Sequence, residues 1–193
     1  MSGIWAVKNE EENGQVKFQK LSTVSQQIDF THMILSASSA DISGSGTPLA
    51  EKIADMAPTR ENVAEISSYM RQRVEKAFRE AGLSYGPDVK FSVDPGGGLS
   101  ITGDRSDIEQ VRALFESDES LSDDMKTFLE FADKMPQYER MLEYQIKLAN
   151  CETEAEEDLL YEEYEDLFDG EDHYETSAVF GSTGISMEYE YIE

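Results

Sequence analysis

The clearest alternation of apolar and polar residues lies between residues 88 and 103. Apolar side chains occupy every second position on either side of a turn, at Val89, Phe91, Val93, Leu99 and Ile101. The turn between them, from Asp94 to Gly98, contains one proline and three glycines. Proline fixes φ and glycine tolerates positive φ, so this segment suits a hairpin loop. The pattern predicts a β-hairpin over about residues 88–103.

Amphipathic helical patterns flank this hairpin on both sides. Before it, apolar residues recur every three or four positions between Thr59, which can cap a helix, and Gly82, which can end one. After it, Ser106 and Glu109 match a capping box ahead of the next apolar stripe. A further helical pattern meets Pro136 and continues beyond it, which predicts a kinked helix or a helical pair. The fold class expected is α+β, mainly helical, with amphipathic helices packed on a central hairpin.

Weaker strand patterns lie at both ends of the chain. Residues 4–7 and 16–18 are rich in β-formers and flank an Asn-Gly turn, which predicts an N-terminal hairpin within residues 1–21. Residues 185–192 alternate apolar and polar positions, which predicts a strand that covers an exposed sheet edge in this molecule or in another.

The composition between these elements predicts the domain boundaries. Residues 22–48 are rich in Ser, Gly and Thr and predict a flexible linker, and residues 49–150 form the predicted α+β core. Thr153 and Glu156 match a second capping box, so an acidic helix and a strand-like tail are expected over residues 151–193.

Negative charge is concentrated toward the C-terminus. The chain of 193 residues has a formal charge of −25, of which residues 116–193 supply −21, and no Lys or Arg follows Lys147. Such a surface argues against direct binding to nucleic acid or to an anionic membrane, because both require basic residues to neutralise phosphates. We therefore expect a basic protein partner, and the oligomeric state stays open.

The cysteine content and the N-terminal sequence suggest a compartment. Cys151 is the single cysteine, which excludes an intramolecular disulfide framework and suits a reducing environment. The first residues resemble no secretory signal, and no run of about 18 apolar residues is present. We expect a cytoplasmic protein, with signal-independent secretion as an open alternative.

Candidate catalytic groups are few. The two histidines, His32 and His173, accompany no nucleophile motif, and acidic neighbours would raise the pKa of the Cys151 thiol. The glycines at 96–98 lead into a strand rather than a helix, unlike a phosphate-binding loop. The acids near residue 170 do not match the spacing of a calcium-binding loop. We expect no enzyme activity, no catalytic residue, no cofactor and no metal site.

Three passages resemble a group of uncharacterised bacterial proteins. They are the helix start at 58–62, the hairpin segments at 91–94 and 101–104, and the apolar stripe over 108–115. The resemblance covers about residues 57–135, and its motifs are structural: a cap, a hairpin turn and a second cap. It implies that the middle of the chain folds as one unit. It implies no activity and transfers no functional residue.

Charge and amphipathicity together suggest a function. We expect a non-catalytic interaction protein of the adaptor, chaperone or inhibitor type that binds a basic protein through its C-terminal acidic helices. The alternative is a DNA mimic that occupies the cleft of a DNA-binding or RNA-guided protein, and a carboxylate-based hydrolase is a distant third. The expected partner-binding residues are Glu156, Glu157, Leu160, Glu163, Tyr164, Asp166, Leu167 and Phe168.

Overall fold

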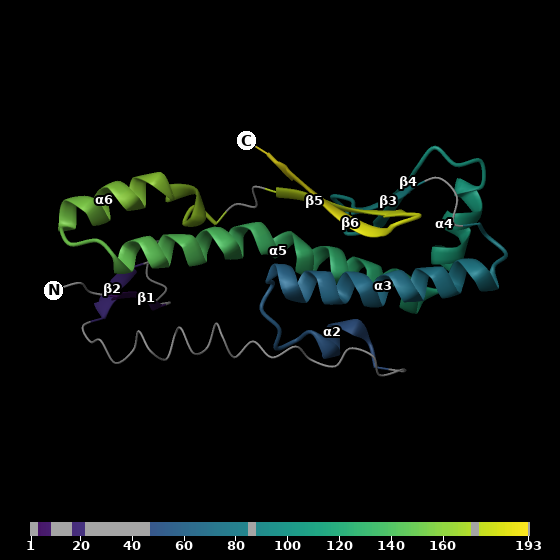
Figure 1. Ribbon diagram of the computed structural model, residues 1–193, viewed down its shortest axis with the longest axis horizontal. Coiled ribbons are helices and arrows are strands. Elements are labelled where there is room, and N and C mark those ends of the chain that lie inside the picture. Colours follow the sequence, from purple (N-terminus) through teal and green to yellow (C-terminus); the bar gives the residue numbers. More distant parts are fainter. Residues whose placement is uncertain (1–3, 9–16, 22–46, 85–87, 171–173, 193) are drawn as a thin grey trace. The chain divides into compact units, whose positions relative to one another are not determined.

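The chain divides into two compact units. The computed structural model describes residues 4–8, 17–21, 47–84, 88–170 and 174–192 (Figure 1). The core unit comprises Ser39–Tyr138 and Asp172–Glu193, and the second unit comprises Met1–Ser38 and Glu139–Glu171. The sequence predicts boundaries after residues 21, 48 and 150 instead. The difference arises because the C-terminal segment returns to the sheet of the core unit.

The core unit contains a four-stranded antiparallel sheet. Its strands are β3 (Val89–Val93), β4 (Leu99–Thr102), β5 (Tyr174–Gly181) and β6 (Gly184–Tyr191), in the order β4-β3-β5-β6. The predicted hairpin is confirmed as β3 and β4. In its loop, the Asp94 carboxylate accepts hydrogen bonds from the backbone N–H groups of Gly96 and Gly98, at 2.8 and 3.0 Å. These hydrogen bonds from a side chain of the loop to its own backbone stabilise the loop conformation.

The C-terminal strand pattern is also confirmed, with a difference in its pairing. β6 pairs with β5, and β5 is the strand that pairs with β3, so that Phe91 lies opposite Ala178. The inserted strand β5 is buried at Thr176, Ser177 and Ala178 in succession. A central strand buried on both faces loses the alternation by which strands are found in sequence. β6 therefore becomes an edge of the sheet.

Among the described residues, four helices belong wholly or partly to the core unit. They are α2 (Leu49–Lys52), α3 (Arg60–Glu80), α4 (Ile108–Ser117) and α5 (Glu119–Ala149), which passes into the second unit. The predicted cap of α3 is present, because the Thr59 hydroxyl accepts a hydrogen bond from the N–H of Asn62. Fully buried side chains of α3, β3 and α5 meet in the core, among them Ile66, Met70, Val74, Phe78, Phe91 and Phe128. The mainly helical α+β class is thus confirmed.

Helix α5 is continuous through Pro136. The sequence left a kinked helix and a helical pair as alternatives, and the structure contains one helix of 31 residues. Proline has no N–H to donate, so one backbone hydrogen bond is lost without ending the helix. The boundary between the two units, after Tyr138, falls within the following turn.

The capping box predicted at Ser106 is wrong. Helix α4 begins one residue later, with Asp107 at its N-cap and no side-chain capping bond. The Asp107 carboxylate instead binds the buried guanidinium of Arg105 through two hydrogen bonds of 2.6 and 2.7 Å. Arg105 also donates to the carbonyl of Ser84 at 2.9 Å and lies over the ring of Phe78. The guanidinium thus joins the end of α3 to the start of α4.

A second buried ionic contact joins α2, α3 and α5. The carboxylate of Asp124, whose side chain is 5% exposed, accepts a hydrogen bond of 3.0 Å from the N–H of Leu49 and pairs with Arg73. Because a buried charge is costly without partners, these contacts fix where α2 begins against the two longer helices.

The second unit contains two short antiparallel strands, β1 (Ile4–Lys8) and β2 (Lys17–Leu21). They lie where the sequence predicts an N-terminal hairpin. The turn at 9–16 and nearly all of the expected linker, at 22–46, lie outside the described residues. Within the described residues, no helix is sufficiently long and apolar to span a membrane.

Candidate functional site

The acidic helix predicted after Thr153 is present as α6 (Glu154–Glu163). Its capping box is confirmed. The Thr153 hydroxyl accepts a hydrogen bond of 3.3 Å from the N–H of Glu156, and the Glu156 carboxylate accepts bonds from the N–H groups of Glu152 and Thr153 at 2.8 and 3.0 Å. These backbone donors lower the pKa of Glu156. We call residues 139–170, which contain the end of α5, α6 and the short 3₁₀ helix Glu165–Leu167, the helical hairpin.

The helical hairpin has a small hydrophobic core of its own. Leu160, Tyr164 and Leu167 are buried, at 7%, 3% and 8% exposure. They pack against the apolar residues Met141, Tyr144, Leu148, Cys151 and Phe168. The ring of Tyr144 contacts those of Tyr164 and Phe168 at centroid distances of 5.6 and 5.2 Å.

Two cations of α5 bind acids of the helical hairpin. Arg140 donates two hydrogen bonds to the Asp166 carboxylate, one of them 2.9 Å long. Lys147 donates to Glu163 and to the hydroxyl of Tyr164, at 2.8 and 2.7 Å. These acceptors raise the pKa of Lys147. Arg140 and Lys147 are the only bases among residues 139–170, which contain 12 acids.

The structure therefore assigns internal roles to most of the expected partner-binding residues. Leu160, Tyr164 and Leu167 form the core of the helical hairpin, so they are not exposed anchors for a partner. The acids Glu163 and Asp166 are paired within the helical hairpin, and Glu156 caps its own helix. The remaining two, Glu157 and Phe168, are half-buried, and Phe168 stacks on Tyr161. For the four that belong to α6 the reason is helical geometry: Glu156, Glu157, Leu160 and Glu163 are spaced so that they share the side of α6 that faces α5.

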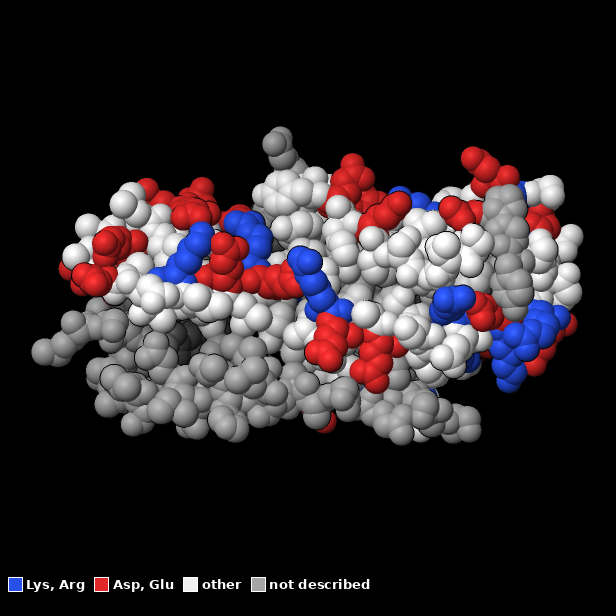
Figure 2. Space-filling view, viewed as in Figure 1, with Lys and Arg blue, Asp and Glu red and all other residues white. Residues whose placement is uncertain are grey.

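The opposite side of α6 carries a different set of residues, which we call the outer face: Glu154, Asp158, Leu159 and Glu162. All four are exposed, and Leu159 has 66% of its surface accessible. The three acids are spaced by four residues, which places them about 6 Å apart along the helix. Among the residues whose side chains are described, no Lys or Arg forms a salt bridge with them. Figure 2 shows acidic side chains gathered over α6, at the left of the view.

Two further large apolar residues of the helical hairpin are exposed. Tyr161, beside the outer face, is 45% exposed and stacks on Phe168 with a centroid distance of 5.2 Å. Ile146 is as exposed as Leu159, at 66%. It lies two residues after Tyr144, which turns it to the side of α5 that faces away from the small core. The sequence pattern thus did not distinguish the exposed apolar residues Leu159, Tyr161 and Ile146 from the buried ones beside them, such as Leu160.

Cys151 is the one thiol of this region. Cys151 is half-buried, and burial together with Glu156 and Glu157 raises the pKa of its thiol. Its possible partner His173 lies outside the described residues. Within the described part of the chain, no three His, Cys, Asp or Glu side chains form a group that could hold a metal ion.

Comparison with known proteins adds no assignment. No protein-family model, no curated protein and no solved structure matches the chain. The resemblance of residues 57–135 to bacterial proteins stays a prediction.

Proposed function

We propose that the chain is a non-catalytic interaction protein that binds a basic protein partner through the outer face of α6. One observation carries this proposal: three acids without a described basic partner lie beside an exposed leucine on a helix whose other side packs in a small hydrophobic core. Exposed acids speed the encounter with a basic surface, and a desolvated apolar side chain supplies affinity and slows dissociation. A reducing compartment such as the cytoplasm suits its single cysteine.

The internal ion pairs support this role. Arg140 and Lys147 are engaged at the inner side of the helical hairpin, so they do not neutralise the acids of the outer face. The capping box and the small aromatic core hold α6 in place before a partner arrives. Preorganisation of this kind lowers the entropic cost of binding.

The DNA-mimic alternative requires acids along a rod with few exposed apolar side chains. Exposed Leu159 and Tyr161 on the same helix as these acids favour the adaptor type of interaction over the mimic. An excess of double-stranded DNA separates the two, because DNA would displace a partner from a mimic and leave an adaptor complex intact.

A site-specific photo-crosslinker tests the proposed face in the full chain. We would place it at position 159 and, as a control, at position 146, where the natural side chain has the same exposure of 66%. In a lysate of the source cells, position 159 should give an adduct with a basic protein that position 146 does not give. Identical adducts from both positions, or adducts with acidic proteins, would contradict the proposal.

The recovered partner then allows a quantitative test with matched variants. Replacing the three outer-face acids by their amides should weaken binding and flatten its dependence on salt between about 0.05 and 0.3 M. The control removes the same charge from exposed positions of the core unit, through Glu61→Gln, Glu116→Gln and Glu130→Gln. Equal weakening by both triple variants would show that the total charge, rather than this face, is responsible.

A further inference from the structure

A groove in the core unit differs in charge from the rest of the chain. It has a volume of about 410 Å³ and lies between α3 and the hairpin of β5 and β6. Its twelve lining residues include two arginines and no acid, although the chain has 41 acids. Those that face a ligand from the two walls include Arg60, Ser67 and Arg71 of α3 and Ile185, Met187 and Tyr189 of β6. Volumes of this order are typical of ligand sites.

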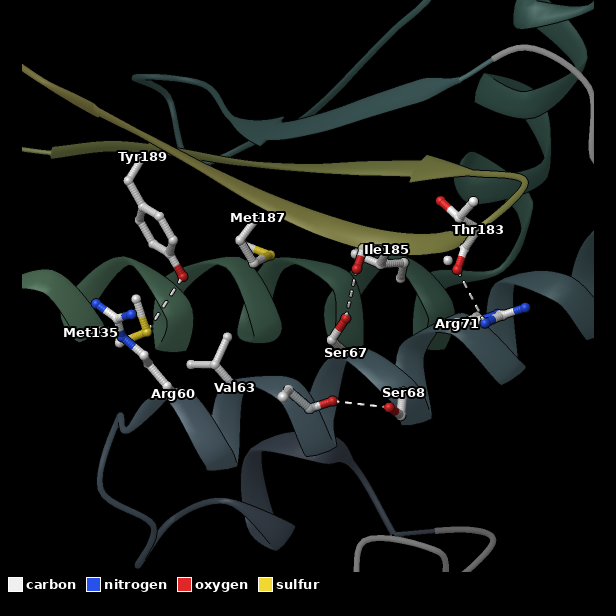
Figure 3. Close-up of a pocket in the computed structure, with 12 residues that line it drawn as sticks. Arg60, Val63, Ser67, Ser68, Arg71, Met135, Thr183, Ile185, Met187 and Tyr189 are labelled. Carbon is white, nitrogen blue, oxygen red and sulfur yellow. Dashed lines mark hydrogen bonds between the residues drawn. The ribbon is translucent and has the colours of Figure 1, made fainter.

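One wall of the groove is a single stripe of α3. Its six residues follow the spacing i, i+3, i+4, i+7, i+8 and i+11, so they share one face of the helix. Arg60 and Arg71 stand at the two ends of this stripe, about 16 Å apart along the axis, with small residues between them. Figure 3 shows the two arginines at opposite ends of the close-up, with Ile185, Met187 and Tyr189 projecting from β6 toward α3.

Arg71 has the donors that an anionic ligand requires. Its Nε donates to Glu75 at 2.7 Å and its Nη1 reaches the carbonyl of Thr183 at 3.4 Å. A guanidinium has five N–H donors, so these two contacts hold the plane in position and leave donors for another acceptor. Its side chain is 44% exposed, which gives a ligand access to it.

The second wall presents main-chain groups. The carbonyl of Ile185 accepts a hydrogen bond of 3.2 Å from the Ser67 hydroxyl on α3, so it points out of the sheet and away from β5. Peptide groups of alternate strand residues point to the same side, so those of Met187 also face this edge. An extended chain laid along β6 would find both a main-chain partner and apolar side chains.

We propose that this groove binds an extended acidic segment of another protein, which adds to the edge of β6 at Met187 and places one carboxylate on Arg60 and one on Arg71. About five extended residues span the distance between the arginines. Residues 1, 3 and 5 of such a segment face the same side, so the pattern is acidic, apolar, acidic. A single-headed amphiphile fits less well, because an arginine stands at each end of the groove.

A second copy of this chain is a poor occupant of the same edge. Pairing two β6 strands would bring the exposed Glu188 and Glu190 of both copies together on one face of the joined sheet. Like charges on paired strands destabilise the pairing. The groove is also separate from the outer face of α6, so failure of either proposal leaves the other standing.

The test uses a fluorescent peptide, Glu-Thr-Val-Thr-Glu with blocked ends, and the full chain at about 0.15 M salt. Wild type should bind it at least tenfold more tightly than it binds Gln-Thr-Val-Thr-Gln, because charge-assisted hydrogen bonds are the stronger kind. Arg60→Gln and Arg71→Gln should each weaken binding about tenfold. Lys76→Gln, which removes an equally charged, 73% exposed side chain elsewhere on α3, should leave it unchanged.

A second peptide tests the strand pairing without altering the protein. Methylation of the valine nitrogen removes one backbone donor, and binding should fall about tenfold or more. Equal binding of the methylated peptide would refute addition to β6. No binding of the acidic peptide, or equal losses in the Lys76 and Arg71 variants, would refute the groove as a site for acidic segments.

Discussion

Two neighbouring leucines of α6 offer a direct test of which side of the helix faces a partner. Leu160 is 7% exposed and packs in the core of the helical hairpin, whereas Leu159 is 66% exposed on the outer face. Replacing a buried leucine by alanine costs about 2–5 kcal/mol, through lost transfer energy and the cavity left behind. Leu159 buries only a third of its surface, so Leu159→Ala should cost less than about 1 kcal/mol.

Hydrogen exchange measures both effects locally. A loss of about 3 kcal/mol raises the exchange rate of a protected amide by roughly a hundredfold, since about 1.4 kcal/mol corresponds to a factor of ten. In Leu160→Ala we expect this acceleration at the amides of α6. If the helical hairpin is stable by less than about 3 kcal/mol, these amides should lose their protection against exchange entirely. Leu159→Ala should change them by less than about fivefold.

The amides of β3, which lie in the core unit, provide an internal reference. They should keep their exchange rates in both variants, because neither leucine contributes to the larger core. If Leu159→Ala accelerated α6 exchange as strongly as Leu160→Ala, the assignment of inner and outer sides would be refuted.

Three other predictions concern the ionic groups. Asp124→Ala should lower the free energy of unfolding by about 1–3 kcal/mol in urea titrations, because the N–H of Leu49 loses its buried acceptor and Arg73 loses its ion pair, whereas Asp123→Ala at a 57% exposed position should cost less than about 1 kcal/mol. Iodoacetamide at pH 8 should modify Cys151 more slowly than free cysteine, because the raised pKa reduces the thiolate fraction, and an equal rate would contradict this. The contact with Arg105 lowers the pKa of Asp107, so its stabilisation should be fully present above about pH 4 and be lost as the pH falls through the lowered pKa. The stability difference between wild type and Asp107→Asn should therefore shrink in acid, and a difference that is constant down to pH 2 would refute the pairing.

The elements that the sequence predicts well are those fixed by neighbours along the chain. The hairpin of β3 and β4 follows from alternation and from a loop that Asp94 holds by itself. The capping box at Thr153 uses residues three positions apart. Strand β5 escaped prediction because the run from Thr176 to Ala178 is buried without alternation.

Which side of α6 faces inward could not be predicted from the sequence. Periodicity identifies α6 as amphipathic, but two adjacent leucines do not reveal which of them faces inward. That choice depends on the partners of the helix, Lys147 and Arg140, which bind acids 16 and 26 residues away. Ion pairs at such separations leave no local pattern, so the paired acids and the unpaired ones looked alike in the sequence.

After α6 the chain returns to the core unit as strand β5, so the acidic segment can be altered separately from the sheet. Residues 139–171 interrupt the core unit between α5 and β5, and every member of the larger hydrophobic core lies outside them. Shortening the chain from its C-terminal end would strip β5 and its buried Phe180 from the sheet, whereas an internal excision would spare both. The acidic segment is thus an insert. Substitutions can change its charge and insertions can change its length while the surrounding core unit keeps its sequence. The residues of the helical hairpin and those of the larger hydrophobic core thus lie in separate stretches of one chain.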